Sequence, residues 1–516
     1  MMTRSQRAQV LPILLLLISL MILLLTAWVS DDAFITLRTV DNWAHGYGPT
    51  WNISERVQTY THPLWMLLLA SLYPFIPNGY FTAVVLSVAT SLIVQIIFLY
   101  NYRHDVFAML FGWAILILSK AFVDYSTSGL ENPLTHLLIL LFAIEFLRSE
   151  FPVPARKFQI LALLAGFSVL NRMDTLLFFA PALIYLFLFQ HRNWRGVVIL
   201  ATAFLPFIFW ELFSVFYYGF LFPNTAYAKL NAGVSHIALL HQGVLYFINS
   251  LRLDPITLIT TASALCLTVL YRGRKELLLA SGICLYLVYI LYIGGDFMSG
   301  RFFSAVVLLS VVLLLQRAKD FSPRGKYSMA AIVLILGVLP LIVTSLRSQP
   351  AQERTSGVLD PSSGIADERL FYLPSNQLIH ALENMPMPDH PWAEIGKQYR
   401  KQGPAVKVEG AIGMLGYFAG PQVHIVDIWA ICDPLLSRIK IRDSNWRIGH
   451  YPRPIVDGYI ETLQTGENHI QDPQLAQYYE KLKIIISGDL WSWDRIKVIW
   501  KMNTGQYDDL LPAYQD

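Results

Sequence analysis

Eleven apolar stretches run through the first two thirds of the sequence, and they limit how the chain can fold more than any other feature. A bilayer core about 30 Å thick requires about 20 apolar residues per helix, and fewer where a helix is tucked among its neighbours. The stretches lie near residues 10–29, 80–101, 105–123, 133–148, 158–170, 175–190, 196–218, 255–271, 276–293, 302–316 and 327–345. Only 15% of the residues are charged and 55% are hydrophobic, whereas soluble proteins carry about 25% charged residues. We therefore expect a polytopic α-helical membrane protein.

Two apolar segments need a separate interpretation. Arg4 and Arg7 precede the first stretch as in a signal peptide, but the stretch is long and no small-x-small cleavage site follows it, so we expect a retained helix. The segment from Pro63 to Phe75 is too short to span comfortably and has a proline near each end. We expect this segment to lie flat or re-entrant at the membrane interface.

The distribution of basic residues predicts the orientation. With the N-terminus in the cytoplasm, the loops on that side carry more than twice as many Lys and Arg residues as the external loops before residue 345. Because short cytoplasmic loops are enriched in Lys and Arg, this assignment is self-consistent. An odd number of spans then places the C-terminal part of the chain outside the cytoplasm.

The sequence changes character after residue 345, where span-length apolar stretches end and Pro, Gly and charged residues recur. We therefore expect a membrane part, residues 1–345, with residues 30–79 as its first external loop, and a soluble extracytoplasmic α/β domain, residues 346–516. Residues 348–366 have the composition of a linker. The predicted elements of the soluble domain are strands at Val406–Glu409 and Val423–Ile428 and a helix at Pro473–Leu482 capped by Asp472.

Conspicuous polar residues gather on the external side, at the ends of predicted spans, whereas the cytoplasmic loops are short and hold mostly Lys and Arg. The external residues include Asp31, Asp32, Glu131, Asn132, Arg172, Asp174, Asn224, Lys229, Asp296 and Arg301. Ionisable residues at a membrane edge are a functional-site hypothesis by default. Simpler interpretations stay open, because an acidic pair can mark a helix end, Glu131 can open a helix, and Arg172 can form a local ion pair with Asp174.

Several classes of site are not supported by the sequence. The net charge is +3 and the basic residues form no stripe, which argues against nucleic-acid binding. The 3 cysteines include no CxxC pair, so neither a disulfide framework nor a zinc site is predicted. His45, His62 and Glu55 could gather a metal ion with the Asp31–Asp32 pair, but their spacing matches no ligand pattern. We predict no cofactor and leave a divalent cation open.

Short segments of this chain together resemble a known family. The acidic pair after the first span and the first loop ending in Thr61-His62-Pro63-Leu64-Trp65 are similar to the GT-C class of integral-membrane glycosyltransferases. More narrowly, an ordered set of motifs resembles the terminal arabinofuranosyltransferases of actinobacterial cell walls. The motifs are DDAFITLR, NWAHGYGPTWNISERVQTYTHPLW, GLENPL, NRMD, FPNTAYAKL, GGDFMSGRFF, GMLGYFAGPQVHIVDIWAICDP and WRIGHYPRP.

The resemblance implies a GT-C-like catalytic domain in residues 1–345 of a multi-pass protein of a bacterial plasma membrane. It implies transfer of a sugar from a polyprenyl-phosphate donor to a cell-envelope glycan or lipid-linked acceptor on the external face. An aspartate of the first loop, Asp31 or Asp32, would remove the proton of the acceptor hydroxyl in an inverting displacement. The identity of the sugar stays open, with an arabinofuranose-like sugar favoured by the resemblance.

The chemistry of such a transfer assigns roles to the other external residues. A carboxylate must reach the acceptor hydroxyl, and a departing phosphate requires positive charge or a metal. The residues expected to bind the donor phosphate or sugar are Arg56, Arg172, Lys229, Arg301, Glu131, Asn132, Asp174, Asn224 and Asp296. Those expected to contact the acceptor are His62, Trp429, Trp446 and His450, although the last three could equally belong to a protein core.

Three other interpretations compete with this one. A secondary transporter usually places ionisable residues near the bilayer midplane on interrupted helices, whereas here the charges gather at one interface, apart from Lys120 within a predicted span. A cell-envelope polymer ligase or lipid-linked oligosaccharide ligase would share the leaving group. A receptor or scaffold would not need so many spans.

Overall fold

The computed structural model describes residues 4–346, 358–383, 386–442 and 446–511, and these residues form two compact units. The first, here called the helical unit, comprises Met1–Val29, Ala83–Phe207 and His236–Met387. The second, here called the mixed unit, comprises Ser30–Thr82, Ile208–Ser235 and Pro388–Asp516. Residues 30–79, which are predicted to form the first external loop, therefore fold with the tail.

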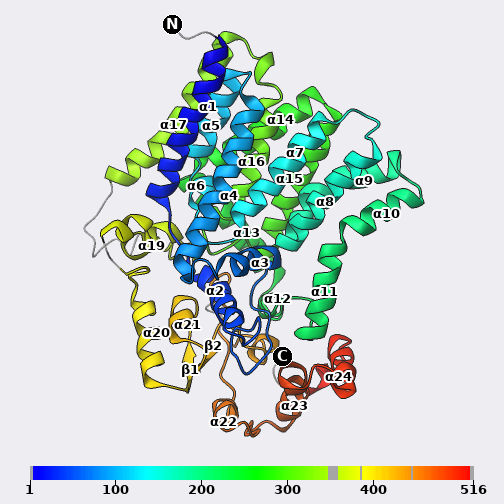
Figure 1. Ribbon diagram of the computed structural model, residues 1–516, viewed down its shortest axis with the longest axis vertical. Helices are drawn as coiled ribbons and strands as arrows, with labels where there is room; N and C mark the ends of the chain where they lie inside the picture. The colour runs from blue at the N-terminus through cyan, green and yellow to red at the C-terminus, as the bar shows by residue number, and fades with distance from the viewer. Residues whose placement is uncertain (1–3, 347–357, 384–385, 443–445, 512–516) are drawn as a thin grey trace. The chain divides into compact units, whose positions relative to one another are not determined.

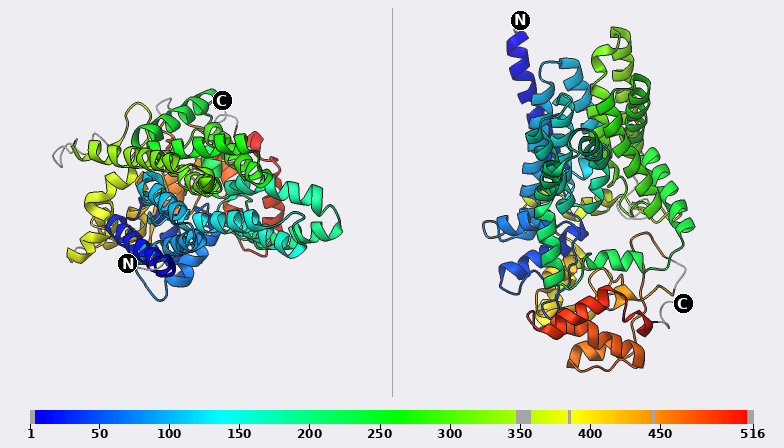
Figure 2. Two further views of the ribbon diagram at one scale, coloured as in Figure 1. Left: turned by 90° about the horizontal axis from the view of Figure 1, so that it is seen from above. Right: turned by 90° about the vertical axis from the view of Figure 1, so that its right-hand side faces the viewer.

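The helical unit is built from helices of which the longer ones run side by side (Figures 1 and 2). They are α1 (Arg4–Thr26), α4 (Gly79–Tyr102, whose first residues lie in the mixed unit), α5 (Val106–Leu118), α6 (Lys120–Asp124), α7 (Asn132–Arg148), α8 (Ala155–Asn171), η1 (Met173–Thr175), α9 (Leu176–Gln190), α10 (Trp194–Ala203), α13 (His236–Leu253), α14 (Pro255–Tyr271), α15 (Arg274–Ile293), α16 (Phe303–Leu315), η2 (Ala318–Asp320), α17 (Pro323–Leu346), α19 (Glu368–Asn376) and η3 (Leu378–Glu383).

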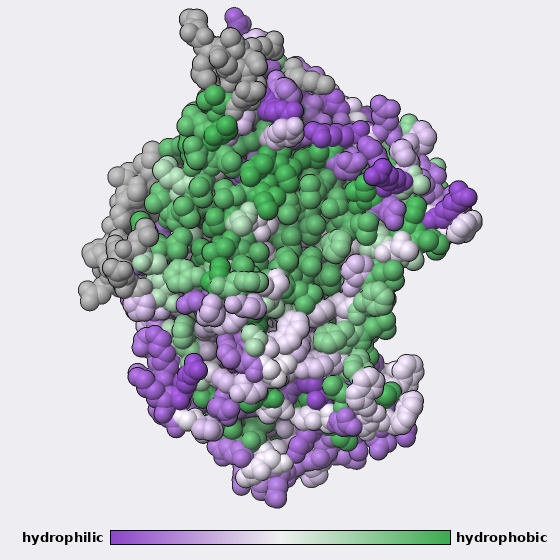
Figure 3. Space-filling model, in the orientation of Figure 1, coloured by the Kyte–Doolittle hydropathy of each residue, from purple (hydrophilic) through white to green (hydrophobic). Residues whose placement is uncertain are grey.

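Helix α16 forms the centre of this unit, because each of its residues is buried. It packs against α14, α7 and α5, and its side chains belong to one continuous apolar core. The outer helices expose apolar side chains instead, such as Ile13 and Leu17 of α1. Figure 3 shows hydrophobic residues gathered over these helices. A helix that is apolar on all sides belongs to a large core or a membrane, and an exposed apolar belt is typical of a lipid-facing surface.

A helix lies at each of the eleven predicted spans, but their number as membrane spans stays a prediction. By length and composition, 3 helices of the described chain could cross a membrane, or up to 5 if each bent pair is one span. The stretch 196–218 is divided into α10 and α11 (Leu205–Tyr217), which meet at 55°. Helix α13 was not predicted, because its His, Gln, Asn and Arg residues interrupt the apolar pattern, and it meets α14 at 108°.

The mixed unit combines short helices with two parallel strands. Its elements, besides most of α11, are α2 (Asp31–Ala44), α3 (Pro63–Leu72), α12 (Asn224–Leu230), α20 (Pro391–Gln402), β1 (Ala405–Glu409), α21 (Met414–Ala419), β2 (Val423–Asp427), η4 (Leu436–Arg438), α22 (Tyr459–Thr465), α23 (Pro473–Ser487), α24 (Trp493–Asn503) and η5 (Asp508–Leu510). The strands pair in the register Ala405↔Val423 to Glu409↔Asp427. Both predicted strands are present, and the side chain of Asp472 caps α23 as predicted.

The predicted domains, 1–345 and 346–516, stay a prediction as a division into membrane and external parts. The compact units have other boundaries, because residues 358–387 belong to the helical unit. There the backbone N–H of Ser299 donates to the carbonyl of Ala366 at 2.9 Å, and the rings of Trp28 and Tyr372 stack at 5.8 Å. Of the predicted linker, residues 348–357 lie outside the described residues and residues 358–366 lie in the helical unit.

A buried arginine joins α2 to the tail within the mixed unit. The guanidinium of Arg38 donates to the carbonyls of Trp51 at 2.8 Å, Gly416 at 2.7 Å and Val423 at 2.8 Å. It also lies 4.3 Å from the centre of the Trp51 ring. Arg38 is 1% exposed, so the three carbonyl groups accept hydrogen bonds from its guanidinium instead of from water.

We expect Arg38→Ala to destabilise the protein by about 3 kcal/mol or more, because it leaves buried carbonyls without their donor. Thermal unfolding in detergent would measure the loss. The matched control is Lys401→Ala, an exposed residue in the last turn of α20, for which a change within about 0.5 kcal/mol is expected. Equal effects of the two substitutions would contradict the role given to Arg38.

Candidate active site

The acidic pair Asp31–Asp32 opens helix α2. Ser30 is the N-cap, and its hydroxyl oxygen accepts a hydrogen bond from the backbone N–H of Ala33 at 3.3 Å. Carboxylates are favoured in the first turn because the helix dipole and the free N–H groups there are positive. The pair therefore begins a helix, and the simpler interpretation that it marks a helix end is wrong.

The carboxylate of Asp31 is held by the tail. Its Oδ2 accepts from the N–H of Gly413 at 3.0 Å and its Oδ1 accepts from the N–H of Met414 at 2.7 Å. A Cβ at Gly413 would lie 1.9 Å from the carbonyl oxygen of Asp31, so this approach requires glycine. Burial raises the pKa of Asp31 to about 7, with a further increase from the charge of Asp32, against the opposing hydrogen bond from Met414.

His62 is connected to the same helix as the acidic pair. It is the residue that precedes α3, and its Nε2 lies 2.9 Å from the hydroxyl of Thr36. Asp32 and Thr36 are four residues apart in α2, so they project from one face of the helix. The predicted acceptor contact His62 therefore lies on the side of α2 that also carries Asp32.

Two residues predicted to bind the donor have structural partners in the mixed unit. The side chain of Asn224 donates to the carbonyls of Ala430 at 3.0 Å and Asp433 at 3.0 Å, and accepts from the hydroxyl of Ser437 at 2.9 Å. The guanidinium of Arg56 donates to carbonyls of the tail, those of Ile485 and Gly488, and burial lowers its pKa. These contacts tie α12 and the first loop to the tail.

Lys229 is exposed in the last turn of α12, where a cation is favoured by the helix dipole.

The aromatic residues predicted to contact the acceptor also lie in the mixed unit and are half-buried. The rings of Trp429 and His450 meet edge to face at 5.1 Å, and the indole N–H of Trp429 donates to the carbonyl of Gly410 at 2.7 Å. Trp446 lies 5.8 Å from Tyr451, ring to ring. Burial lowers the pKa of His450 to about 3, so its ring is neutral at physiological pH.

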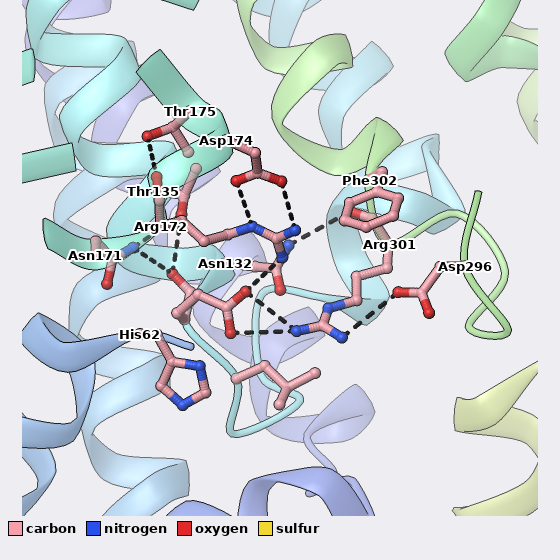
Figure 4. A network of polar contacts seen from close by, with 12 residues as sticks. His62, Asn132, Thr135, Asn171, Arg172, Asp174, Thr175, Asp296, Arg301 and Phe302 are labelled. Atoms are coloured by element: carbon pink, nitrogen blue, oxygen red, sulfur yellow. Dashed lines mark hydrogen bonds and ion pairs between the residues drawn. The ribbon is translucent and has the colours of Figure 1, made fainter. Parts of the chain in front are cut away.

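The remaining predicted residues form one ionic network in the helical unit (Figure 4). Arg172 donates to both oxygens of Asp174, at 2.8 and 2.7 Å, and to Glu131 at 2.7 Å. Arg301 donates to Glu131 at 3.1 and 3.3 Å and lies 3.5 Å from Asp296. Glu131 thus bridges two arginines, and the expected local ion pair between Arg172 and Asp174 is present.

Chain turns at the helix ends bring these five charges together. Glu131 directly precedes α7, as predicted for a helix start, Arg172 lies between α8 and η1, and Arg301 lies in the turn before α16. Amide groups support the turns: Asn132 donates to the hydroxyl of Ser304 at 3.0 Å, and Asn171 donates to that of Thr135 at 2.9 Å. Thr135 was not predicted, whereas Asn171 is the first residue of the predicted motif Asn171-Arg172-Met173-Asp174 but was given no role of its own.

The balance of charge in this network matters for what it can bind. Two arginines face three carboxylates, and the side chains of Glu131 and Asp174 are 0% and 8% exposed. Arg172 binds carboxylates through Nε and both terminal nitrogens at 2.8 Å or less, whereas Arg301 lies 3.1 Å from Glu131 and 3.5 Å from Asp296. An anion would therefore have to draw an arginine away from a carboxylate, and Arg301 is held less closely than Arg172.

Sequence reasoning missed most of a second ionic cluster in the helical unit. The ammonium group of Lys120 contacts Asp124 and lies 2.9 Å from Asp367, and Arg369 donates to Asp124 at 2.8 Å. Lys120 was the one charge noticed within a predicted span, and here it is neutralised at the start of α6. Among the described residues no group of three or more His, Cys, Asp or Glu side chains could hold a metal ion.

Comparison with solved structures identifies the fold. No family model matches the chain. The structure is similar to that of ArnT from Cupriavidus metallidurans bound to undecaprenyl phosphate, with a TM-score of 0.50, 12% identity and coverage of 82% of this chain and 86% of ArnT. The same protein in the apo state matches with a TM-score of 0.50 and 12% identity, over 81% and 86% of the two chains. The fold is therefore the mostly helical GT-C membrane fold.

Two proteins of similar sequence make the resemblance more specific than the fold does. The chain is 28% identical to a terminal β-(1→2)-arabinofuranosyltransferase of Mycobacterium tuberculosis, over 82% of this chain and 80% of the relative. It is 27% identical to the protein of the same name from Corynebacterium glutamicum, over 88% and 79% of the two chains. The resemblance to terminal arabinofuranosyltransferases that the sequence motifs indicated is confirmed.

The network predicts an order of stability among substitutions. Arg172→Met should destabilise the protein by about 3 to 5 kcal/mol, because it leaves buried carboxylates without their cation. Glu131→Gln should cost less, about 1.5 to 3 kcal/mol for lost charge-assisted hydrogen bonds, because two arginines and two carboxylates then remain. Unfolding of both variants in the same detergent tests this order. If Glu131→Gln destabilised the protein more than Arg172→Met, the excess of carboxylates over arginines would not determine the stability of the network.

Proposed function

We propose that this protein is a glycosyltransferase that moves a sugar from a polyprenyl-phosphate donor to a glycan or lipid-linked acceptor on the external face of a bacterial plasma membrane. The observation that carries the proposal is the similarity to two terminal arabinofuranosyltransferases over more than four fifths of this chain. It also favours an arabinofuranose-like sugar. The lipid-phosphate part of the donor is supported by the shared fold with ArnT, whose structure contains undecaprenyl phosphate.

We propose Asp32 as the general base that removes the proton of the acceptor hydroxyl. Its neighbour Asp31 is engaged at both oxygens by N–H groups of Gly413 and Met414, which suits a residue that positions the start of α2. Asp32 follows it in the first turn of α2, on the helix face that continues to Thr36 and His62. A base must be within hydrogen-bond reach of the hydroxyl it deprotonates, and His62 on this face could orient that hydroxyl.

The leaving phosphate would be stabilised by Arg301. Its carboxylate contacts are longer than those of Arg172, so turning it toward an anion breaks weaker interactions. Glu131, Asp174 and Asp296 would then position the arginines. Fixed positive charge aimed at the departing oxygen is the electrostatic contribution that such a reaction needs. Lys229, which is exposed, is a second cation for the donor, whereas we assign Arg56 and Asn224 to structural support.

The acceptor would be bound by the mixed unit. His62 lies beside α2, and Trp429 with His450 forms an aromatic pair on the segment after β2. Aromatic faces suit the C–H surfaces of sugar rings, and the half-buried rings are already fixed by protein contacts. Trp446 is the weaker candidate, because its ring packs 5.8 Å from that of Tyr451.

The proposal is tested by transfer of radiolabelled sugar from a polyprenyl phosphate to a glycan acceptor in membranes that contain the protein. Asp32→Asn should lower the rate by about 100-fold to 10,000-fold, because it removes the general base. Asp31→Asn should retain a higher transfer rate than Asp32→Asn, because it alters a residue that positions the start of α2 and leaves the proposed base in place. Unfolding temperatures of both variants separate loss of chemistry from loss of structure.

Other outcomes of this assay contradict parts of the proposal. If Asp31→Asn abolishes transfer while Asp32→Asn retains it, the two roles are reversed. If both variants keep the full rate, no residue of the pair is the base. Label that crosses sealed vesicles without forming a glycosidic bond would identify a transporter instead.

A single displacement by a base-activated hydroxyl also predicts the stereochemistry. Attack from the side opposite the phosphate inverts the anomeric carbon, so the product linkage should have the configuration opposite to that of the donor. Proton NMR of the donor and the purified product measures both configurations. Retention would contradict the single displacement and would require a nucleophile in the protein.

A further inference from the structure

Helix α24, near the end of the mixed unit, has two apolar faces. One face carries Arg495, Val498, Ile499 and Met502 and is buried against the unit. The other carries Trp493, Ile496 and Trp500, at the spacing i, i+3, i+7, and these residues are 74%, 41% and 69% exposed. A helix of a soluble surface needs only one apolar stripe. The second stripe has no function in the packing of the mixed unit.

The exposed area on this helix is large. A tryptophan side chain that becomes buried removes about 150 to 250 Å² from water. Trp491, in the turn before α24, is also exposed, at 77%. Single apolar residues on a surface need no explanation, but tryptophans repeated along one helix face mark an interaction surface.

Charged residues border the exposed stripe on one side. Asp494, Lys497 and Lys501 are exposed and follow one another around the helix between its two apolar faces. Lys497 lies 3.4 Å from Asp494, in a contact at the surface. Tryptophan beside lysine on an amphipathic helix is the composition found where a helix lies in the headgroup region of a membrane.

The position of α24 is fixed by the end of helix α11 (Figure 1). The guanidinium of Arg495 donates to the carbonyls of Phe216 at 2.6 Å and Tyr217 at 2.9 Å, which are the last residues of α11. The ring of Trp491 lies 4.9 Å from that of Phe216. An arginine that binds the free carbonyls at a helix C-terminus satisfies groups that have no partner within the helix.

Helix α11 itself belongs to a candidate membrane span. Together with α10 it passes the length and hydropathy criteria for crossing a bilayer as a bent pair. Its Phe209 and Leu212 are 63% and 61% exposed, as expected of side chains that face lipid. The apolar surface of α11 therefore leads to the end of the helix at which Arg495 holds α24.

We propose that α24 is an interfacial helix whose Trp493, Ile496 and Trp500 insert into the headgroup region of the outer leaflet of the membrane that α11 crosses. This contact would fix the C-terminal end of the chain to the bilayer surface. A glycan is the other ligand that tryptophans can bind, but Ile496 separates them here. The side-chain amide of Asn503, the last residue of α24, donates to the carbonyls of Gly219 and Ile499, both at 2.8 Å. The three side chains of the stripe themselves offer a sugar only the indole N–H groups of the two tryptophans as hydrogen-bonding partners.

Quenching by brominated lipids tests the proposal on the full chain in single-copy nanodiscs. Trp emission is measured for the wild type and for the double variant Trp493→Phe, Trp500→Phe, which keeps the stripe apolar. The difference between them is the emission of these two tryptophans. We expect phospholipids brominated near the headgroup end of the acyl chain to remove the greater part of this difference. We also expect acrylamide in the water to quench it less than it quenches free tryptophan.

A matched control uses Trp392→Phe. Trp392 is a half-buried residue of α20 that packs within the mixed unit. Its emission should therefore be the same in brominated and unbrominated phospholipids. The proposal is overturned if the emission of Trp493 and Trp500 is also equal in brominated and unbrominated phospholipids. It is likewise overturned if arabinan oligosaccharides shift that emission while brominated lipids leave it unchanged, because the stripe would then bind glycan. Neither readout depends on transferase activity.

Discussion

The carboxylate of Asp31, bound by two backbone N–H groups of the tail, is the contact on which the candidate active site depends. Asp31 and Met414 are 383 residues apart in sequence, and the hydrogen bonds from Gly413 and Met414 tie the start of α2 to the tail. Arg38 reinforces the contact two turns later, by donating to the carbonyl of Gly416 within α21 and to that of Val423 at the start of β2. The first loop is therefore one folded structure with the tail, and the chemistry proposed for Asp32 rests on that support.

In the helical unit, the buried carboxylates of Glu131 and Asp124 are each held in an ionic network. Glu131 is fully buried and is matched by two arginines, and Asp124 is matched by Lys120 and Arg369. Removing any one partner leaves a charge away from water, which is far more costly than an exposed ion pair. The same networks can respond to a ligand, because a phosphate that draws Arg301 away changes the balance at Glu131. Structure and proposed donor binding thus use the same side chains.

Much of the fold could be predicted from the sequence, because apolar length and proline and capping signals act locally. Helices lie at the predicted spans, Asp472 caps α23, and the two predicted strands pair. Helix α13 was missed because its polar residues break the apolar pattern, and α2 was not predicted although Ser30, Asp31 and Asp32 form an N-cap signal.

The candidate site was predictable as a set of residue types, but their partners were not. Arg56 and Asn224 have the side chains of ligand-binding residues, yet in the structure they bind carbonyls far away in sequence. Arg38, the most connected arginine of the first loop, was not singled out, because an isolated arginine in a loop carries no local signal. The resemblance to arabinofuranosyltransferases, in contrast, was carried by an ordered set of motifs and did not depend on knowing contacts.

The long separation between Asp31 and Met414 also bears on how the protein matures. Synthesis from the N-terminus delivers the acidic pair early, whereas the two backbone amides that bind Asp31 emerge hundreds of residues later. A chain that ended before Gly413 would therefore lack both of the N–H groups that bind the carboxylate of Asp31.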